Sequence, residues 1–260
     1  MFVDSHCHLD RLDLSGRNND LQAVMDDAAA RNVSRMLCVA IDMEKLPGML
    51  ATVNRFDNVY ASAGVHPLHV TEGIPEISTL LEYAADPKII ALGESGLDYY
   101  YQKDTIERQQ ESFIRHLQAS AQSRLPVIVH TRDAREDTIS LLRQHADPVV
   151  GGVLHCFTEN WQMASEALEL NYMISFSGII TFRNAAELRE VVRQVPIENL
   201  LIETDSPYLA PIPYRGKSNE PQYVVEVAQC VADIKGLRIE EVAEITSANF
   251  DRMFPKAVSG

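Results

Sequence analysis

The sequence has no apolar run long enough to cross a membrane, and it has few cysteines. No stretch approaches the roughly 18 continuous apolar residues of a membrane span, and Asp4 and His6 stand where a signal peptide needs basic and apolar regions. The cysteines lack any Cys-x-x-Cys spacing, which indicates neither a disulfide framework nor a zinc knuckle. We therefore expect a cytoplasmic protein with reduced thiols.

Positive charge is also scarce. The chain has 23 Lys and Arg against 37 Asp and Glu, a net charge of −14, which argues against nonspecific coating of nucleic acid because that binding depends on Lys and Arg. The net charge does not exclude an enzyme that acts on phosphates, since bound divalent cations would offset carboxylates locally. No linker or repeat divides the chain, and its apolar fraction of 46% is ample for a large core, so we expect one domain, residues 1–260.

The chain alternates between strand-like and helix-like segments. Apolar runs predict strands at 2–6, 34–40, 59–65, 89–94, 126–130, 151–155, 172–177 and 200–204, and helical patterning lies at 19–32, 43–55, 75–85, 105–124, 135–145, 160–170, 185–194, 220–235 and 239–253. Some strands are apolar throughout, as in parallel sheets covered on both faces. Eight such units predict an α/β fold, a TIM-type (β/α)₈ barrel, with a doubly wound open sheet as the alternative.

Residues of metal-ligating types stand where the predicted strands end. The first strand runs into Asp4-Ser5-His6-Cys7-His8, and simple alternation would place Asp4, His6 and His8 on one face and Ser5 and Cys7 on the other. Later strands deliver His66, Glu94, His130, His155 and Asp205. Each alone is often a surface or packed group, but together they indicate a metal site. Only a closed ring would bring the first and eighth strands together.

Six motifs spread over essentially the whole chain resemble the TatD-type metal-dependent deoxyribonucleases of the amidohydrolase-like barrels. They are Asp4-Ser5-His6-Cys7-His8-Leu9-Asp10, Gly64-Val65-His66-Pro67, Gly93-Glu94-Ser95-Gly96-Leu97-Asp98-Tyr99, Pro126-Val127-Ile128-Val129-His130-Thr131-Arg132, His155-Cys156-Phe157 and Glu203-Thr204-Asp205-Ser206-Pro207-Tyr208-Leu209-Ala210-Pro211. Jointly these motifs are highly specific. Ser95 stands where many relatives carry Ile or Thr, but it is not an expected ligand.

The resemblance implies a pair of divalent cations. Its ligands would be His6, His8, Glu94 and Asp205 for one cation, and Glu94, His130 and His155 for the other, with Glu94 bridging. Two cations about 3.5–4 Å apart need an anionic bridge, and they can stabilise both the attacking and the leaving oxygen of a phosphodiester. Mixed imidazole and carboxylate ligation accommodates Mg, Mn, Zn or Ni.

Glu94 and Asp205 are the expected catalytic residues. Asp205 would orient the metal-activated water and accept its proton as general base; alternatively, it is a helix cap before Pro207. Asp4 and Glu203 lie two residues deeper on their strands. They would either fix the tautomers of the imidazoles or form a buried structural ion pair.

Four residues are the expected substrate contacts: His66, Arg132, Arg215 and Lys217. Arg215 and Lys217 stand in the Pro-rich loop from Pro207 to Pro221, which is expected to overhang the site and to offer charge-assisted bonds to phosphate. Solvated surface charge is the alternative for both. Three roles are possible for His66: a contact to phosphate, a ligand of a further metal site, or a packed loop residue. Expected rim aromatics that could stack bases are Tyr99, Tyr100, Tyr101 and Phe157.

The preferred function is hydrolysis of phosphodiester bonds at single-stranded ends of DNA, or of RNA, with a 3′ to 5′ polarity that only the resemblance implies. The alternative is a metal-dependent hydrolase of small amides, lactones or phosphoesters, because barrels with this metal arrangement host many chemistries. A non-catalytic binding module is disfavoured by the intact ligand set. We expect neither association with a membrane nor an obligate protein partner.

Overall fold

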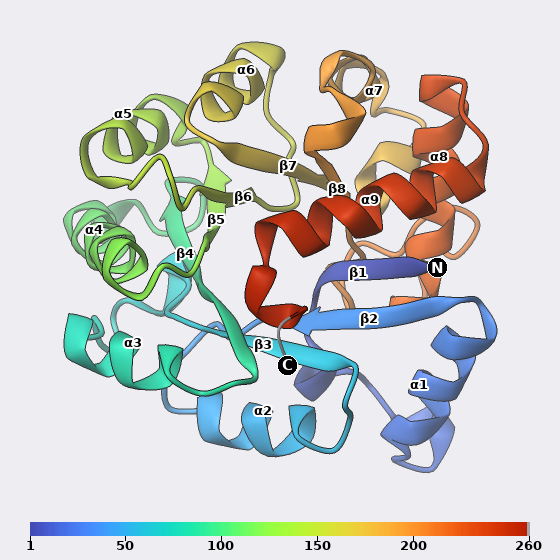
Figure 1. The fold of residues 1–260 in the computed structure, drawn as a ribbon, viewed down its shortest axis with the longest axis horizontal. Coiled ribbons are helices and arrows are strands. Elements are labelled where there is room, and N and C mark those ends of the chain that lie inside the picture. Colours follow the sequence, from blue (N-terminus) through green and yellow to red (C-terminus); the bar gives the residue numbers. More distant parts are fainter. Residues whose placement is uncertain (259–260) are drawn as a thin grey trace.

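Eight parallel strands form the centre of the molecule. In the computed structural model, which describes residues 1–258, they are β1 (Phe2–Cys7), β2 (Val33–Cys38), β3 (Val59–Ala63), β4 (Ile89–Asp98), β5 (Val127–Arg132), β6 (Gly152–Leu154), β7 (Tyr172–Phe176) and β8 (Leu200–Ile202). They pair in sequence order from β1 to β8, every pair parallel (Figure 1). The TIM-type (β/α)₈ barrel predicted from the sequence is confirmed, and the open-sheet alternative is excluded.

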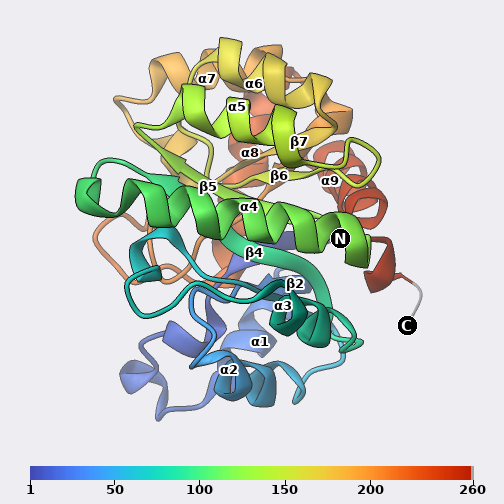
Figure 2. The same ribbon diagram turned by 90° about the vertical axis from the view of Figure 1, so that its left-hand side faces the viewer.

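Helices separate the strands along the chain and surround them in space. They are α1 (Leu21–Ala30), α2 (Leu46–Val53), α3 (Ile77–Ala84), α4 (Ile106–Ser123), α5 (Arg135–His145), α6 (Trp161–Glu169), α7 (Ala186–Gln194), α8 (Val224–Lys235) and α9 (Ile239–Met253). Figure 2 shows α4 on the outer side of the barrel, in front of β4 and β5. Each predicted helix is present, with ends that differ by a few residues.

The ring is nearly closed by contacts between the ends of β1 and β8. Cys7 and Ser206 form a parallel bridge, the amide of His8 donates to the carbonyl of Ser206 at 2.8 Å, and the amide of Asp205 donates to the carbonyl of His6 at 2.9 Å. Because parallel strands all end on the same face, the carboxyl ends of β1 and β8 meet side by side there. The two ends of the predicted ligand set therefore lie next to each other.

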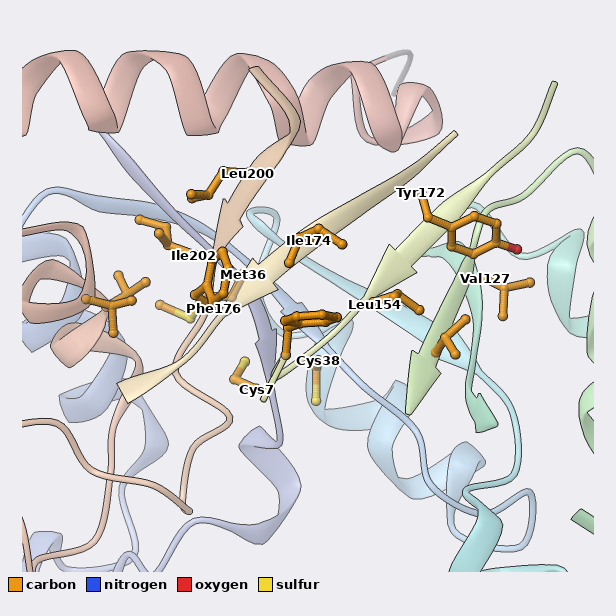
Figure 3. Close-up of a cluster of buried hydrophobic side chains, with 14 of the residues drawn as sticks. Cys7, Met36, Cys38, Val127, Leu154, Tyr172, Ile174, Phe176, Leu200 and Ile202 are labelled. Carbon is orange, nitrogen blue, oxygen red and sulfur yellow. The ribbon is translucent and has the colours of Figure 1, made fainter. Parts of the chain in front are cut away.

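The apolar core has two layers. The outer layer lies between strands and helices and includes both Cys7 and Cys38 (Figure 3). The inner layer fills the barrel with side chains such as Val3, Ile128 and Leu201, together with side chains of α9. Helix α9 crosses the end of the barrel at which β1 begins (Figure 1). This end is consequently packed shut, and the opposite face is left for chemistry.

Strand register shifts at several positions in the barrel, and two of these shifts fall at expected ligands. The register between β1 and β2 shifts between Asp4 and Cys7, and the register between β4 and β5 shifts between Leu92 and Ser95. Such irregularities re-aim side chains and are over-represented next to functional sites. His6 lies within the first shift and Glu94 within the second.

Candidate metal centre

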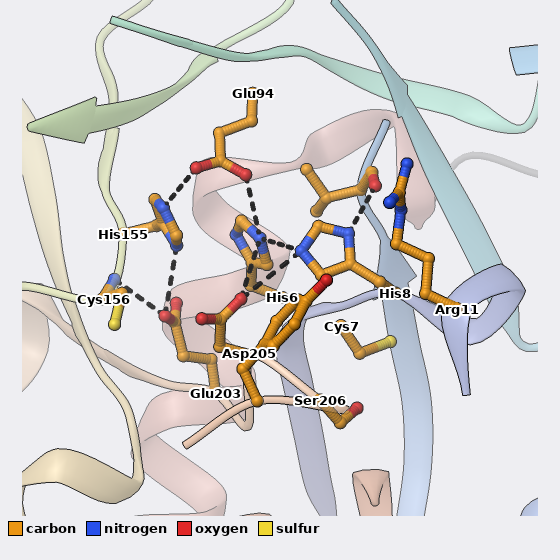
Figure 4. A network of polar contacts seen from close by, with 12 residues as sticks. His6, Cys7, His8, Arg11, Glu94, His155, Cys156, Glu203, Asp205 and Ser206 are labelled. Atoms are coloured by element: carbon orange, nitrogen blue, oxygen red, sulfur yellow. Dashed lines mark hydrogen bonds and ion pairs between the residues drawn. The ribbon is translucent and has the colours of Figure 1, made fainter. Parts of the chain in front are cut away.

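His6, His8 and Asp205 meet where β1 and the end of β8 touch (Figure 4). The Nε2 atoms of His6 and His8 lie 3.3 Å apart, and Asp205 Oδ1 is 3.7 Å from the first and 3.4 Å from the second. His8 Nδ1 lies 2.9 Å from the carbonyl oxygen of Val39. Because a carbonyl only accepts, Nδ1 carries a proton and Nε2 is the nitrogen of His8 that faces the group.

Glu94 lies between this group and three further imidazoles. Its Oε2 is 3.4 Å from His6 Nε2. Its Oε1 is 2.7 Å from His155 Nε2, 3.1 Å from His130 Nδ1 and 3.3 Å from His66 Nε2. Only 3% of the Glu94 side chain is exposed. One buried carboxylate thus presents one oxygen to each of two sets of nitrogen donors.

The backbone around Glu94 leaves no room for larger residues. A Cβ on Gly96, whose φ is +140°, would lie 2.0 Å from the carbonyl oxygen of His130. Glycine is therefore required for both its conformation and the close approach of β4 to β5. The amide of Glu94 donates to the carbonyl of Ala40 at 2.9 Å, and Ser62 Oγ donates to the carbonyl of Gly93 at 2.6 Å. These contacts fix Glu94 and His130 relative to each other.

Glu203 holds His155 from below the cluster. Its Oε1 lies 3.3 Å from His155 Nδ1 and accepts from the amide of Cys156 at 2.7 Å, while its Oε2 accepts from Ser175 Oγ. A carboxylate on the second nitrogen of an imidazole orients the ring and makes it a better ligand. This contact agrees with the orienting role considered for Glu203.

Asp4 and Ser5 differ from the expectation drawn from alternation. The carboxylate of Asp4 accepts from the amide of Thr204 at 2.8 Å and from its hydroxyl at 2.5 Å, and it has no ring partner among the described residues. Ser5 Oγ lies 3.1 Å from Ser175 Oγ, in the polar cluster that holds Glu203. The predicted opposite placement of Ser5 is wrong because the register of β1 shifts between Asp4 and Cys7.

Several ring nitrogens are buried without a hydrogen bond. His6 Nδ1 and both ring nitrogens of His155 have no hydrogen-bond partner within residues 1–258; the contacts of His155 with Glu94 and Glu203 have ion-pair distances but not hydrogen-bond angles. Leaving buried polar atoms unpaired is costly, and such groups are rare. Of these nitrogens, His155 Nε2 faces Glu94 in the cluster, where a cation would satisfy it, so the donor set fits divalent metal.

The electrostatics keep the carboxylates of the cluster charged. Burial alone would raise the pKa of Glu94, but His155, His66 and His130 outweigh it and hold the pKa well below its usual range. Burial also raises the pKa of Asp205, but contact with His8 and His6 lowers it by more. The net effect is a lowered pKa for Asp205. Both side chains are therefore anionic at neutral pH and suited to bind cations.

The predicted substrate contacts separate into two sets. His66 lies inside the cluster, against Glu94, and burial lowers its pKa to about 4, so the ring is neutral. Arg132 is exposed at the end of β5. Arg215 places its guanidinium carbon 3.8 Å from the centroid of the Phe182 ring, and Lys217 is exposed, its amide bonded to the carbonyl of Tyr214. No described contact joins Arg215 or Lys217 to the cluster.

Two residues near the cluster were not singled out by sequence reasoning. Asp98 Oδ2 lies 3.2 Å from His130 Nε2. It stands four residues after Glu94 on the same strand, a same-face spacing that was a usable signal. Tyr208 places its ring centroid 6.0 Å from that of His8. The expectation that Phe157 lies at the rim is wrong, because it is 2% exposed and packs against Phe176 in the outer core.

A parallel eight-stranded barrel with imidazoles and carboxylates gathered at the carboxyl ends of its strands is the arrangement of metal-dependent hydrolases. Sequence comparison identifies the particular family. Residues 3–255 match the model of the TatD related DNase family, and the chain belongs to that family. It is a metal-dependent hydrolase of this family.

Named relatives agree with this assignment. The chain is 50% identical over 252 residues to the uncharacterized metal-dependent hydrolase YcfH of Escherichia coli, which covers 97% of this chain and 95% of that protein. It is 38% identical to the uncharacterized metal-dependent hydrolase YabD of Bacillus subtilis, over 98% and 99% of the two chains. The crystal structure of YjjV, a TatD homolog from Escherichia coli, superposes with a TM-score of 0.89 at 29% identity, covering 98% of each chain.

None of the helices within residues 1–258 combines the length and the apolar character that crossing a membrane requires.

Proposed function

We propose that this protein hydrolyses phosphodiester bonds at single-stranded ends of DNA, with RNA as a second candidate strand, and that it removes nucleotides in the 3′ to 5′ direction. The observation that carries the proposal is the position of Glu94, whose two oxygens face two separate sets of nitrogen donors. A carboxylate in this position is suited to bridge two cations. The name of the family favours DNA over other phosphodiesters.

The proposed ligands follow the two sets of donors. His6, His8, Glu94 and Asp205 would hold one cation, and Glu94, His130 and His155 would hold the other. His66 approaches the same oxygen of Glu94 as His130 does, so it is a further candidate donor for the second cation. Such mixed ligands suit Mg, Mn, Zn or Ni. When bound, divalent cations would supply an activated water and neutralise charge on the phosphate.

The protein's own groups have distinct tasks in this proposal. Asp205 is anionic and lies at the mouth, where it would orient the attacking water and accept its proton. Asp98 and Glu203 hold His130 and His155 in place. Arg132, Arg215 and Lys217 remain the proposed contacts to phosphate oxygens, because charge-assisted hydrogen bonds suit that anion.

Removal of metal is expected to abolish hydrolysis, and Mg²⁺ or Mn²⁺ is expected to restore it, because the imidazoles alone do not activate water sufficiently at neutral pH. The measurement is turnover of a single-stranded oligodeoxynucleotide after chelation and after dialysis into each metal, with metal content determined by elemental analysis. Full turnover of protein that retains no metal would contradict the metal-dependent mechanism.

Linear single-stranded DNA is expected to be shortened from an end, whereas closed circular DNA should remain intact, because a site at a barrel mouth that is packed shut behind it accepts a strand end. The measurement is product length on labelled linear and circular strands, with RNA, blunt duplex, a lactone and an amide as comparison substrates. Efficient cutting of the circle would contradict the exonuclease proposal. Faster turnover of the lactone than of any strand would favour a small-molecule hydrolase.

A further inference from the structure

The exposed aromatic side chains of the described residues are concentrated at the metal centre. Three large aromatic residues are exposed within residues 1–258: Tyr100 at 53%, Tyr101 at 62% and Tyr208 at 51%. Each belongs to a loop that leaves the carboxyl end of a barrel strand, β4 for the first two and β8 for the third. Exposed aromatic rings gathered at one site mark a surface that binds a partner.

Tyr208 covers one side of the cluster. Its ring meets that of His8 edge to face, at an interplanar angle of 68°. The amide of Tyr208 donates to the carbonyl of Asp205 at 2.9 Å, and its carbonyl accepts from the side chain of Asn219 at 2.6 Å. The backbone of Tyr208 is thus fixed next to Asp205, while half of its side chain remains open to solvent.

Tyr100 and Tyr101 are fixed to the other side through Asp98. Asp98 Oδ1 accepts from the amides of Tyr100 at 3.0 Å and Tyr101 at 2.8 Å, while its Oδ2 contacts His130. The two rings meet edge to face, with centroids 4.8 Å apart. One buried carboxylate therefore holds both the loop with the two tyrosines and the imidazole that approaches Glu94.

Arg132 joins this aromatic pair. Its guanidinium carbon lies 4.2 Å from the centroid of Tyr100 and 4.6 Å from that of Tyr101. Among the described residues, no carboxylate lies within ion-pair distance of Arg132, so its charge is available to an anion. A cation over aromatic rings beside an open site offers both a phosphate contact and a flat surface for stacking.

The two aromatic surfaces lie on opposite sides of the barrel. Tyr208 follows β8 and lies against a residue that follows β1, whereas Tyr100 and Tyr101 follow β4 beside β5. In a ring of eight strands in sequence order, β8 and β1 are opposite β4 and β5. The metal-ligating cluster lies between them, so a planar group on either surface would be on a different side of the reacting bond.

We infer that Tyr208 and the pair Tyr100 and Tyr101 are two nucleobase-stacking subsites that hold the nucleotides on either side of the scissile phosphate. This inference rests on the proposed function and adds the requirement for a base on each side of the bond. Stacking is tolerant of sequence because every base has a flat face. The enzyme should therefore grip any strand end but discriminate against nucleotides that lack a base.

The test measures the binding of a phosphorothioate-linked oligodeoxynucleotide, which resists hydrolysis, to the metal-loaded protein by fluorescence anisotropy. Tyr208→Ala, and Tyr100→Ala with Tyr101→Ala, are each expected to weaken binding about tenfold. The Tyr→Phe variants should bind like the wild type, because they keep the rings. Val149→Ala, which alters an exposed apolar residue outside the site loops, is the control and should have no effect.

The second arm uses strands with one abasic position. An abasic nucleotide should weaken binding to the wild type about as much as the matching tyrosine substitution does, and combining the two should add little, because both remove the same stack. Unchanged thermal unfolding of the variants would exclude misfolding. This inference alone would be overturned if the wild type bound the strand and the alanine variants bound it equally well. It would also be overturned if the losses from the alanine substitution and from the abasic position added in full. If the wild type bound no strand, the proposed function would fail together with it.

Discussion

Substitution of Glu94 by alanine is expected to lower turnover by roughly 10³-fold or more, because it removes an anionic ligand from both proposed cations at once. It also leaves the imidazoles of His66, His130 and His155 without the carboxylate on which they converge. The bound metal should fall toward zero per chain. The measurements are turnover of a single-stranded oligodeoxynucleotide and elemental analysis of the purified variant.

His155→Ala is the matched comparison, since it removes one imidazole from only one of the two sets. Its loss of turnover should be smaller, and it should retain the cation held by His6 and His8. Circular dichroism of both variants controls for folding, because His155→Ala also leaves the buried carboxylate of Glu203 without its ring partner. Equal and mild losses in the two variants would show that Glu94 does not bridge.

Asp205→Asn is expected to lower turnover by about 10²-fold or more while part of the metal remains bound, because the amide keeps one oxygen donor but can neither carry the charge nor accept a proton. The backbone of Asp205 has a φ of +56°. Asparagine adopts this left-handed region at least as readily as aspartate does, so the substitution tests the side chain and not the loop.

Turnover and metal content measured together decide the role of Asp205. Near-normal turnover would show that Asp205 only caps the following turn. A complete loss of metal with turnover restored by excess Mn²⁺ would assign it as a ligand without a role as base. Asn219→Asp is not a suitable control, because the side chain of Asn219 donates to the carbonyls of Thr204 and Tyr208 and fixes the same loop.

The fold was predictable because periodicity reports on burial. Runs such as Val127 to Val129 are apolar on both faces, which requires cover on both sides and so a parallel barrel or a doubly wound sheet. Expected ligands on both the first and the eighth strand then favoured the closed barrel, because only a closed barrel brings these two strands together. The clustering of His6, His8, Glu94, His130, His155 and Asp205 was also predictable, because parallel strands end on one face.

Other features depended on register, which the sequence pattern does not encode. Strict alternation would place Ser5 opposite His6, and the register shift in β1 overrides it. Phe157 stands two residues after His155, yet its side chain packs in the core. Its amide donates to the carbonyl of Ser175 on β7, which holds it there. Tyr208 contacts His8 only because β1 and β8 close the ring, a contact between residues 200 positions apart.

That closure also determines when the active site can exist during synthesis. His6 and His8 leave the ribosome before the rest of the barrel, but the backbone partner of His6 is Asp205 and that of His8 is Ser206. At about 5–20 residues per second, the ribosome adds Asp205 roughly 10 to 40 s after His6. A nascent chain therefore carries an incomplete set of ligands for most of its translation, and hydrolytic activity begins only once nearly the whole barrel has been made.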